Sequence, residues 1–160
     1  MFFKIKLSVY LLLMSVALFL FSPIIFATTQ INASSITGYW QTIDGKTKKP
    51  SSIIYVHQKG QWVFGKIVKT FSLPDESKSK VCNHCTGSQK NKPILGLTII
   101  KNMTCTADVC HGGTILDPRS GSVYHANMRL IDAGQQMQVH GYIGIALFGK
   151  TVIWHKVSHA

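Results

Sequence analysis

The sequence of 160 residues is strongly basic, with 17 lysines and arginines against 6 aspartates and glutamates and a formal net charge of +11. So few carboxylates argue against an enzyme that uses a carboxylate pair, because Asp44, Asp117 and Asp132 fall in predicted turns. The lysines are dispersed along the chain, whereas nucleic-acid-binding proteins cluster them on one face. We therefore expect neither a paired-carboxylate hydrolase nor a nucleic-acid-binding protein.

The first 27 residues have the pattern of a secretory signal peptide. Lys4 and Lys6 give it a positive start, residues 9–21 are apolar, and a small-residue exit ends at Ala27. The apolar run is shorter than a membrane span, which needs about 20 residues, so we expect cleavage that leaves no span; an uncleaved anchor is the alternative. Cleavage leaves residues 28–160 as a single domain with a formal charge of +9, either periplasmic or secreted.

The remaining chain consists of short runs that are typical of strands, and no stretch keeps the spacing of an amphipathic helix. In the run from Met137 to Ile145, one side is apolar, which predicts a strand with one buried face. The segment Asp117-Pro118-x-Ser120-Gly121 predicts the turn of a hairpin. The expected strands are 36–43, 52–57, 62–71, 94–100, two runs within 112–124, 137–145 and 151–157.

These eight sequential strands, joined mostly by tight turns, permit a β-sandwich or a closed up-and-down barrel. Only two connections, 74–93 and 101–112, are long enough for the crossovers that a Greek-key sandwich needs. We therefore predict an all-β fold, a small antiparallel up-and-down barrel, because closure removes the exposed edges of the sheet.

Four cysteines lie in these two long connections, and an even number of cysteines in an exported chain favours disulfides. The predicted strand between the connections holds them roughly 23 Å apart at about 3.3 Å per residue. We therefore expect two local bridges, Cys82 with Cys85 and Cys105 with Cys110, and no metal site or cofactor. A shared zinc site that includes a nearby histidine, and a redox-active Cys82-x-x-Cys85 pair, are the alternatives.

Small eight-stranded barrels either are filled by side chains or hold one small ligand. Several side chains from different strands are predicted to face inward and to line a ligand site: Trp40, Tyr55, Phe64, Tyr124, Met128, Val139 and Ile143. A filled interior is the alternative, which bulky residues at every inward position would favour.

A set of short motifs spans nearly all of the chain after residue 27. They are Gly38-x-Trp40, Gly65-Lys66-Ile67-Val68, Cys82-x-x-Cys85-Thr86-Gly87, Lys92-Pro93-Ile94-Leu95-Gly96, Ile115-Leu116-Asp117-Pro118-x-Ser120-Gly121-x-x-Tyr124, Gly141-Tyr142-Ile143-Gly144 and Phe148-Gly149-x-Thr151-x-x-Trp154. In combination they resemble the uncharacterised exported bacterial family known as domain of unknown function 2147. The resemblance implies a small lipocalin-like β-barrel and no established activity.

The resemblance also implies a contact at the barrel floor. In lipocalin-like barrels the Gly-x-Trp tryptophan packs under the floor against a basic residue of the last strand, and these positions fall here on Trp40 and Lys156. His140, Lys150 and Lys156 stand where the family usually has arginine, and the Cys105 and Cys110 pair looks like an addition. Lysine stacks on an aromatic face less well than arginine does.

These observations favour a non-enzymatic envelope protein that binds a small apolar or amphipathic ligand inside the barrel. The basic surface would attract an anionic envelope polymer or lipid. The alternative is a packed barrel that acts on an envelope partner through that surface, and a thiol-redox enzyme is the third hypothesis. No acid, base and nucleophile are assembled by any sequence motif.

Overall fold

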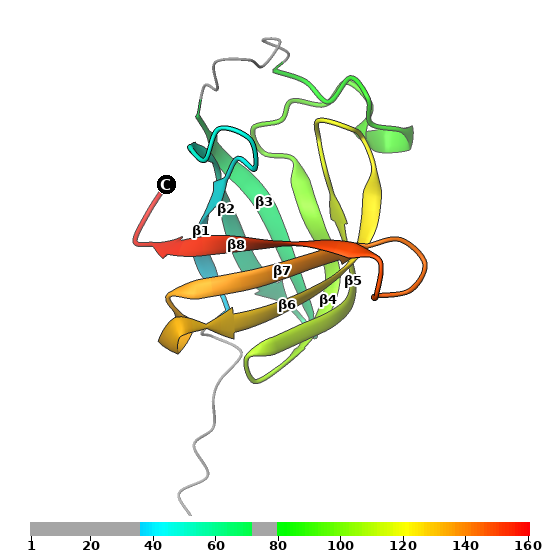
Figure 1. The fold of residues 1–160 in the computed structure, drawn as a ribbon. Helices are drawn as coiled ribbons and strands as arrows, with labels where there is room; N and C mark the ends of the chain where they lie inside the picture. Colours follow the sequence, from blue (N-terminus) through cyan, green and yellow to red (C-terminus); the bar gives the residue numbers. More distant parts are fainter. Residues whose placement is uncertain (1–35, 72–79) are drawn as a thin grey trace, which may run out of the picture. The chain divides into compact units, whose positions relative to one another are not determined.

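The computed structural model describes residues 36–71 and 80–160, and the predicted signal peptide lies outside these residues. Within them, eight antiparallel strands close into one barrel, in which each strand pairs with the next and the last returns to the first (Figure 1). This confirms the predicted all-β up-and-down barrel. The strands are β1 (Gly38–Ile43), β2 (Pro50–Lys59), β3 (Trp62–Thr70), β4 (Thr98–Thr106), β5 (Val109–Leu116), β6 (Val123–Ile131), β7 (Gln136–Tyr142) and β8 (Gly149–Val157).

The two ends of the barrel differ in the length of their connections. Three short turns close one end, which we call the floor, at residues 60–61, 107–108 and 132–135, the last containing the 3-10 turn η3 (Asp132–Gly134). The other end, which we call the mouth, carries the connections 44–49, 71–97, 117–122 and 143–148. The second of these includes the 3-10 turn η2 (Gly87–Gln89). The floor is therefore compact and the mouth is built from loops.

Alternation along the strands places one apolar face inside the barrel. Cross-strand partners share a face, so Trp40 and Ile54, Met128 and Val139, and Met137 and Trp154 meet in the interior. All six side chains are buried. Each is worth roughly 1.5–3 kcal/mol relative to an exposed position, so this face supplies much of the driving force for folding.

Trp40 closes the floor. It is fully buried, and its indole Nε1 donates a hydrogen bond to the carbonyl oxygen of Ile36 at 2.9 Å. Lys156 pairs with Trp40 in the β1–β8 ladder, and its Nζ lies 5.5 Å from the ring centre. The floor contact that the family resemblance implied is therefore present as a cation–π pair.

The fourth strand lies later in the chain than the sequence predicted. It begins at Thr98 rather than Ile94 and runs to Thr106, so the expected loop 101–112 is the β4–β5 hairpin. Gly96 adopts a φ of +87°, and residues 96–97 exchange hydrogen bonds with Ile67 outside the regular ladder. Asn102, at a φ of +56°, forms a bulge in β4, which accommodates this polar residue within the strand.

Both predicted disulfides are present. Cys82 and Cys85 are joined within the 71–97 connection at the mouth, with their Cα atoms 5.4 Å apart. Cys105 and Cys110 face each other in the β4–β5 ladder and close that hairpin near the floor. One disulfide bond thus lies at each end of the barrel.

Candidate functional site

The interior of the barrel, where the sequence predicted a ligand site, is occupied by side chains. Three of the predicted lining residues, Trp40, Met128 and Val139, are buried there. They are surrounded by other bulky inward residues, namely Ile54, Val56, Val63, Ile100, Met103, Met137 and Trp154. Tyr124 also faces inward, but it is only half-buried. The filled interior was the alternative to a cavity.

The predicted inward orientation is wrong for three of the lining residues. Tyr55 lies between the inward side chains of its strand and pairs with the exposed Lys66, so it stands on the outer face. Phe64 is likewise on the outer face, where it lines an open groove. Ile143 lies beyond the end of β7, and 67% of its side chain is exposed. Strand β7 ends at Tyr142, so the alternation that continues through Ile143 does not reflect a strand.

Tyr55 and Phe64 belong to an aromatic row on the outer face of β1, β2 and β3. Ring centres are 5.0 Å apart between Tyr39 and Tyr55, 5.4 Å between Tyr55 and His57, and 6.1 Å between His57 and Phe64. The Nζ of Lys66 lies 5.9 Å from the centre of the Tyr55 ring. These contacts, which are cross-strand except for Tyr55 with His57 on β2, stabilise the sheet from outside.

An ion pair spans the mouth. Arg119, in the turn between β5 and β6, donates through Nη1 to Oδ2 of Asp44, in the turn between β1 and β2. Its Nη2 also donates to the hydroxyl of Ser51 at 3.2 Å. The two turns join strand pairs on opposite sides of the ring of eight. Arg119 therefore ties opposite sides of the rim together.

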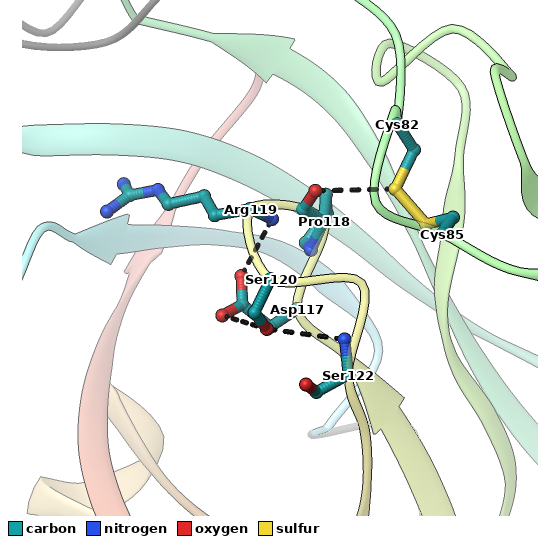
Figure 2. The surroundings of a disulfide bond; sticks show 7 residues. All are labelled: Cys82, Cys85, Asp117, Pro118, Arg119, Ser120 and Ser122. Carbon is teal, nitrogen blue, oxygen red and sulfur yellow. Dashed lines mark hydrogen bonds between the residues drawn. A yellow bond between two sulfur atoms is a disulfide. The ribbon is translucent and has the colours of Figure 1, made fainter.

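The Arg119 turn is held on its other side by the Cys82–Cys85 disulfide (Figure 2). Sγ of Cys82 lies 3.3 Å from the carbonyl oxygen of Pro118, a contact without a proton because the sulfur is in a disulfide. A Cβ on Gly121 would collide with the carbonyl oxygen of His84, so the two loops are in direct backbone contact. The turn is thus clamped between the disulfide loop and Asp44.

Asp44 is the charged group on which this clamp depends. Its carboxylate accepts hydrogen bonds from the backbone N–H of Thr47 at 2.7 Å, from Arg119, from the Thr47 hydroxyl and from the backbone N–H of Lys46. These bonds hold the pKa of Asp44 well below its ordinary value. Asp44 therefore stays ionised, and its role is to hold the turn and Arg119 in place.

The β7–β8 loop, residues 143–148, presents apolar side chains to solvent. The exposed fractions are 67% for Ile143, 61% for Ile145, 81% for Leu147 and 70% for Phe148. Scattered exposed apolar residues are ordinary on a protein surface, but four within six residues form a contiguous patch that indicates a contact site. Figure 1 shows the loop projecting beyond the ends of β7 and β8.

His140 supports this loop from beneath. Its Nε2 lies 2.8 Å from the carbonyl oxygen of Ala146, which can only accept, so Nε2 carries the proton. Its Nδ1 lies 2.8 Å from the hydroxyl of Thr151 on β8. A Cβ on Gly149 would lie 2.6 Å from the carbonyl oxygen of Gly141, so the loop leaves the barrel through a tight backbone contact. The exposed apolar side chains are therefore carried on a supported turn.

Lysines gather beside the loop at the mouth. Lys150 is the second residue after the loop, and its Nζ lies 3.4 Å from the position that a Cβ on Gly45 would take in the β1–β2 turn. That turn carries Lys46, Lys48 and Lys49, all exposed. None of these four lysines pairs with a carboxylate in residues 36–71 and 80–160. The mouth therefore combines an apolar loop with a positive rim.

Two hollows flank the disulfide loop, both on the outside of the barrel. One of about 90 Å³ lies between Cys85, Ile99 and Leu116, and a more open groove of about 480 Å³ lies between Phe64, Leu95 and Lys101.

In the described part of the chain, no three histidine, cysteine or acidic side chains are grouped so as to hold a metal ion. No helix of these residues is long and apolar enough to cross a membrane.

Sequence analysis missed two features of the mouth. The Asp117–Gly121 turn was predicted, but the partner of Arg119 lies 75 residues away, and no local pattern connects them. The break between the strands predicted at 137–145 and 151–157 was found, but β7 ends at Tyr142, and the loop exposes apolar side chains that the alternation had assigned to a strand. Gly144, inside the predicted strand, is the signal for the earlier end.

Comparisons with known proteins agree with this architecture. The model of a family described as "Uncharacterized protein conserved in bacteria (DUF2147)" matches residues 38–156. Among solved structures, the chain is similar to protein HP1028 from the human pathogen Helicobacter pylori, which is described as belonging to the lipocalin family. The TM-score is 0.64 at 18% identity, over 76% of this chain and 82% of that chain, which shows a shared fold. No match was found among proteins with curated descriptions.

Proposed function

We propose that this chain, which belongs to the uncharacterised bacterial family DUF2147, is a non-enzymatic envelope protein that binds its partner with the outer surface of the mouth. The observation that carries the proposal is the contrast between the two candidate surfaces. The interior is filled by buried side chains, whereas the β7–β8 loop exposes most of Ile143, Leu147 and Phe148. A binding protein needs accessible contact surface, and the mouth supplies it.

Two features of the chain support the envelope as the location. The two disulfides are of a kind that forms and persists in oxidising compartments, and residues 1–27 have the pattern of a signal peptide. The positive rim at the mouth suits the anionic lipids and polymers of the envelope. The side chains at the mouth also have structural roles: the cysteines are paired, and Asp44 is bonded to Arg119.

A second candidate function, the carriage of a small apolar ligand inside the barrel, is favoured by the likeness to a protein described as a lipocalin. Small barrels of this size do hold ligands in some proteins. Tyr124, half-buried on the inward face, is the predicted lining residue that such a ligand would meet first.

Photo-crosslinking in the native host separates the two functions. A benzophenone amino acid replaces Phe148 at the mouth in one variant and Trp62, beside the β2–β3 turn at the floor, in the matched control. The proposal predicts adducts from position 148 that are absent from position 62. No adduct at 148, together with a small apolar molecule that co-purifies in native mass spectrometry and saturably shifts tryptophan fluorescence, would establish the carrier function instead.

A further inference from the structure

We propose that the partner of the mouth is an anionic lipid bilayer, into whose interface the β7–β8 loop inserts. The inference rests on the proposed function, because it names the partner of the same surface. The four exposed apolar side chains of the loop would enter the boundary between headgroups and acyl chains. The neighbouring lysines would contact the headgroups.

The first argument is the order in which chemical groups occur along the loop. The apolar side chains of residues 143–148 lie beyond the strand ends, and the first cation that follows them is Lys150. A bilayer has the matching order, with anionic headgroups outside an apolar layer. Interfacial segments bury their apolar face about 5–10 Å deep and keep their lysines at the headgroups.

The second argument is charge complementarity. Lys46, Lys48 and Lys49 lie in the turn that Lys150 approaches, and two acidic residues in the described part of the mouth, Asp44 and Asp117, are already engaged in hydrogen bonds. Asp44 is bonded to Arg119, and the carboxylate of Asp117 accepts from the backbone N–H of Arg119 and from the Ser120 hydroxyl, both at 3.0 Å. The rim therefore presents a positive field to a negative surface.

The third argument is that the loop is already formed. His140 bonds the carbonyl oxygen of Ala146, and the N–H of Phe148 donates to the carbonyl oxygen of Ile145 at 3.1 Å. The backbone of the turn thus satisfies part of its own hydrogen bonding, which lowers the cost of entering a medium poor in water. A preformed loop also loses less conformational entropy on binding.

Vesicle binding tests the proposal with the chain as it is isolated from its host, its N-terminus determined by intact mass. We expect binding to vesicles of equal parts phosphatidylglycerol and phosphatidylethanolamine. Binding to pure phosphatidylcholine should be weaker by about tenfold or more, since each lysine near an anionic surface contributes to affinity. Raised salt should reduce the difference.

Two matched substitutions locate the contact. Leu147→Asp places a charge on the loop, and Leu95→Asp makes the same change at a leucine that is 59% exposed on the disulfide loop. We expect Leu147→Asp to weaken vesicle binding about tenfold or more, and Leu95→Asp to leave it within about twofold. Thermal midpoints of both variants that equal the wild-type value show that folding is preserved. Equal vesicle binding of the two variants contradicts the proposal. This includes the outcome in which an uncleaved N-terminal segment attaches every variant to the vesicles.

A depth measurement gives an independent readout. In a Phe148→Trp variant, brominated phospholipids should quench the added fluorescence. The wild-type signal, which comes from buried Trp40 and Trp154 and from Trp62 at the floor, should change little. Absence of added quenching contradicts insertion. If vesicles are not bound but the crosslinker at position 148 captures an envelope protein, lipid is the wrong partner and the proposed surface function stands. If both experiments are negative, both proposals are wrong.

Discussion

The floor and the mouth of this barrel are held together by different means. At the floor, short turns bring the strands together, Trp40 fills the end of the interior, and Cys105–Cys110 closes a hairpin in register. At the mouth, long loops are joined across the ring by Arg119 and Asp44, and the other disulfide lies within a loop. The floor thus has a buried aromatic ring and a hairpin disulfide, whereas an ion pair joins loops across the mouth. We therefore expect the floor to contribute more to stability than the mouth, whose β7–β8 loop stays exposed.

The largest effect should come from the floor. Trp40→Ala removes a fully buried ring together with its hydrogen bond to Ile36 and its contact with Lys156. Large-to-small changes of this kind cost about 3–5 kcal/mol of unfolding free energy, because a cavity remains. Equilibrium denaturation in urea measures the loss. A cost below that of the mouth variants would show that stability does not reside mainly at the floor.

An intermediate effect should come from the loop contact at the mouth. Gly121 has a φ of +73°, and a Cβ there would collide with the backbone of His84. Gly121→Ala must therefore separate the hairpin turn from the disulfide loop, at a cost of about 1–3 kcal/mol. Gly60→Ala, also at positive φ but with open space around the added Cβ, is the matched control and should cost less. Similar denaturation midpoints for the two variants would mean that the two loops can separate at little cost in unfolding free energy.

The smallest effect concerns the ion pair and depends on pH. The pKa of Asp44 is lowered in the folded chain, so its contribution to stability is present above the ordinary value of 3.8 and is lost as the pH falls below it. Asp44→Asn should therefore lower the urea midpoint at pH 7 and have less effect at pH 3. Measurements of both proteins at the two pH values provide the check. An equal loss at both pH values would mean that the carboxylate charge is not what holds the rim.

How far the sequence predicts this molecule depends on how local each interaction is. Strand alternation placed Trp40, Met128 and Val139 correctly because each lies in a regular strand, in which the residues before and after it face outward. The same alternation misplaced Tyr55, since a row of exposed aromatic rings has the apolar composition of a core. The Arg119–Asp44 pair depends on closure of the whole ring. Periodicity could not have shown it.

The ladder between β1 and β8 determines when the barrel can be completed. Tyr39, Trp40 and Gln41 pair with Val157, Lys156 and His155, which are synthesised after all seven other strands. A chain that emerges N-terminus first therefore holds an open sheet, with both edges unpaired and the inward face of Trp40 lacking its partners from β8. During this interval the unpaired edges expose the nascent protein to edge-to-edge aggregation, and an export route that keeps the chain unfolded until β8 has crossed would protect it.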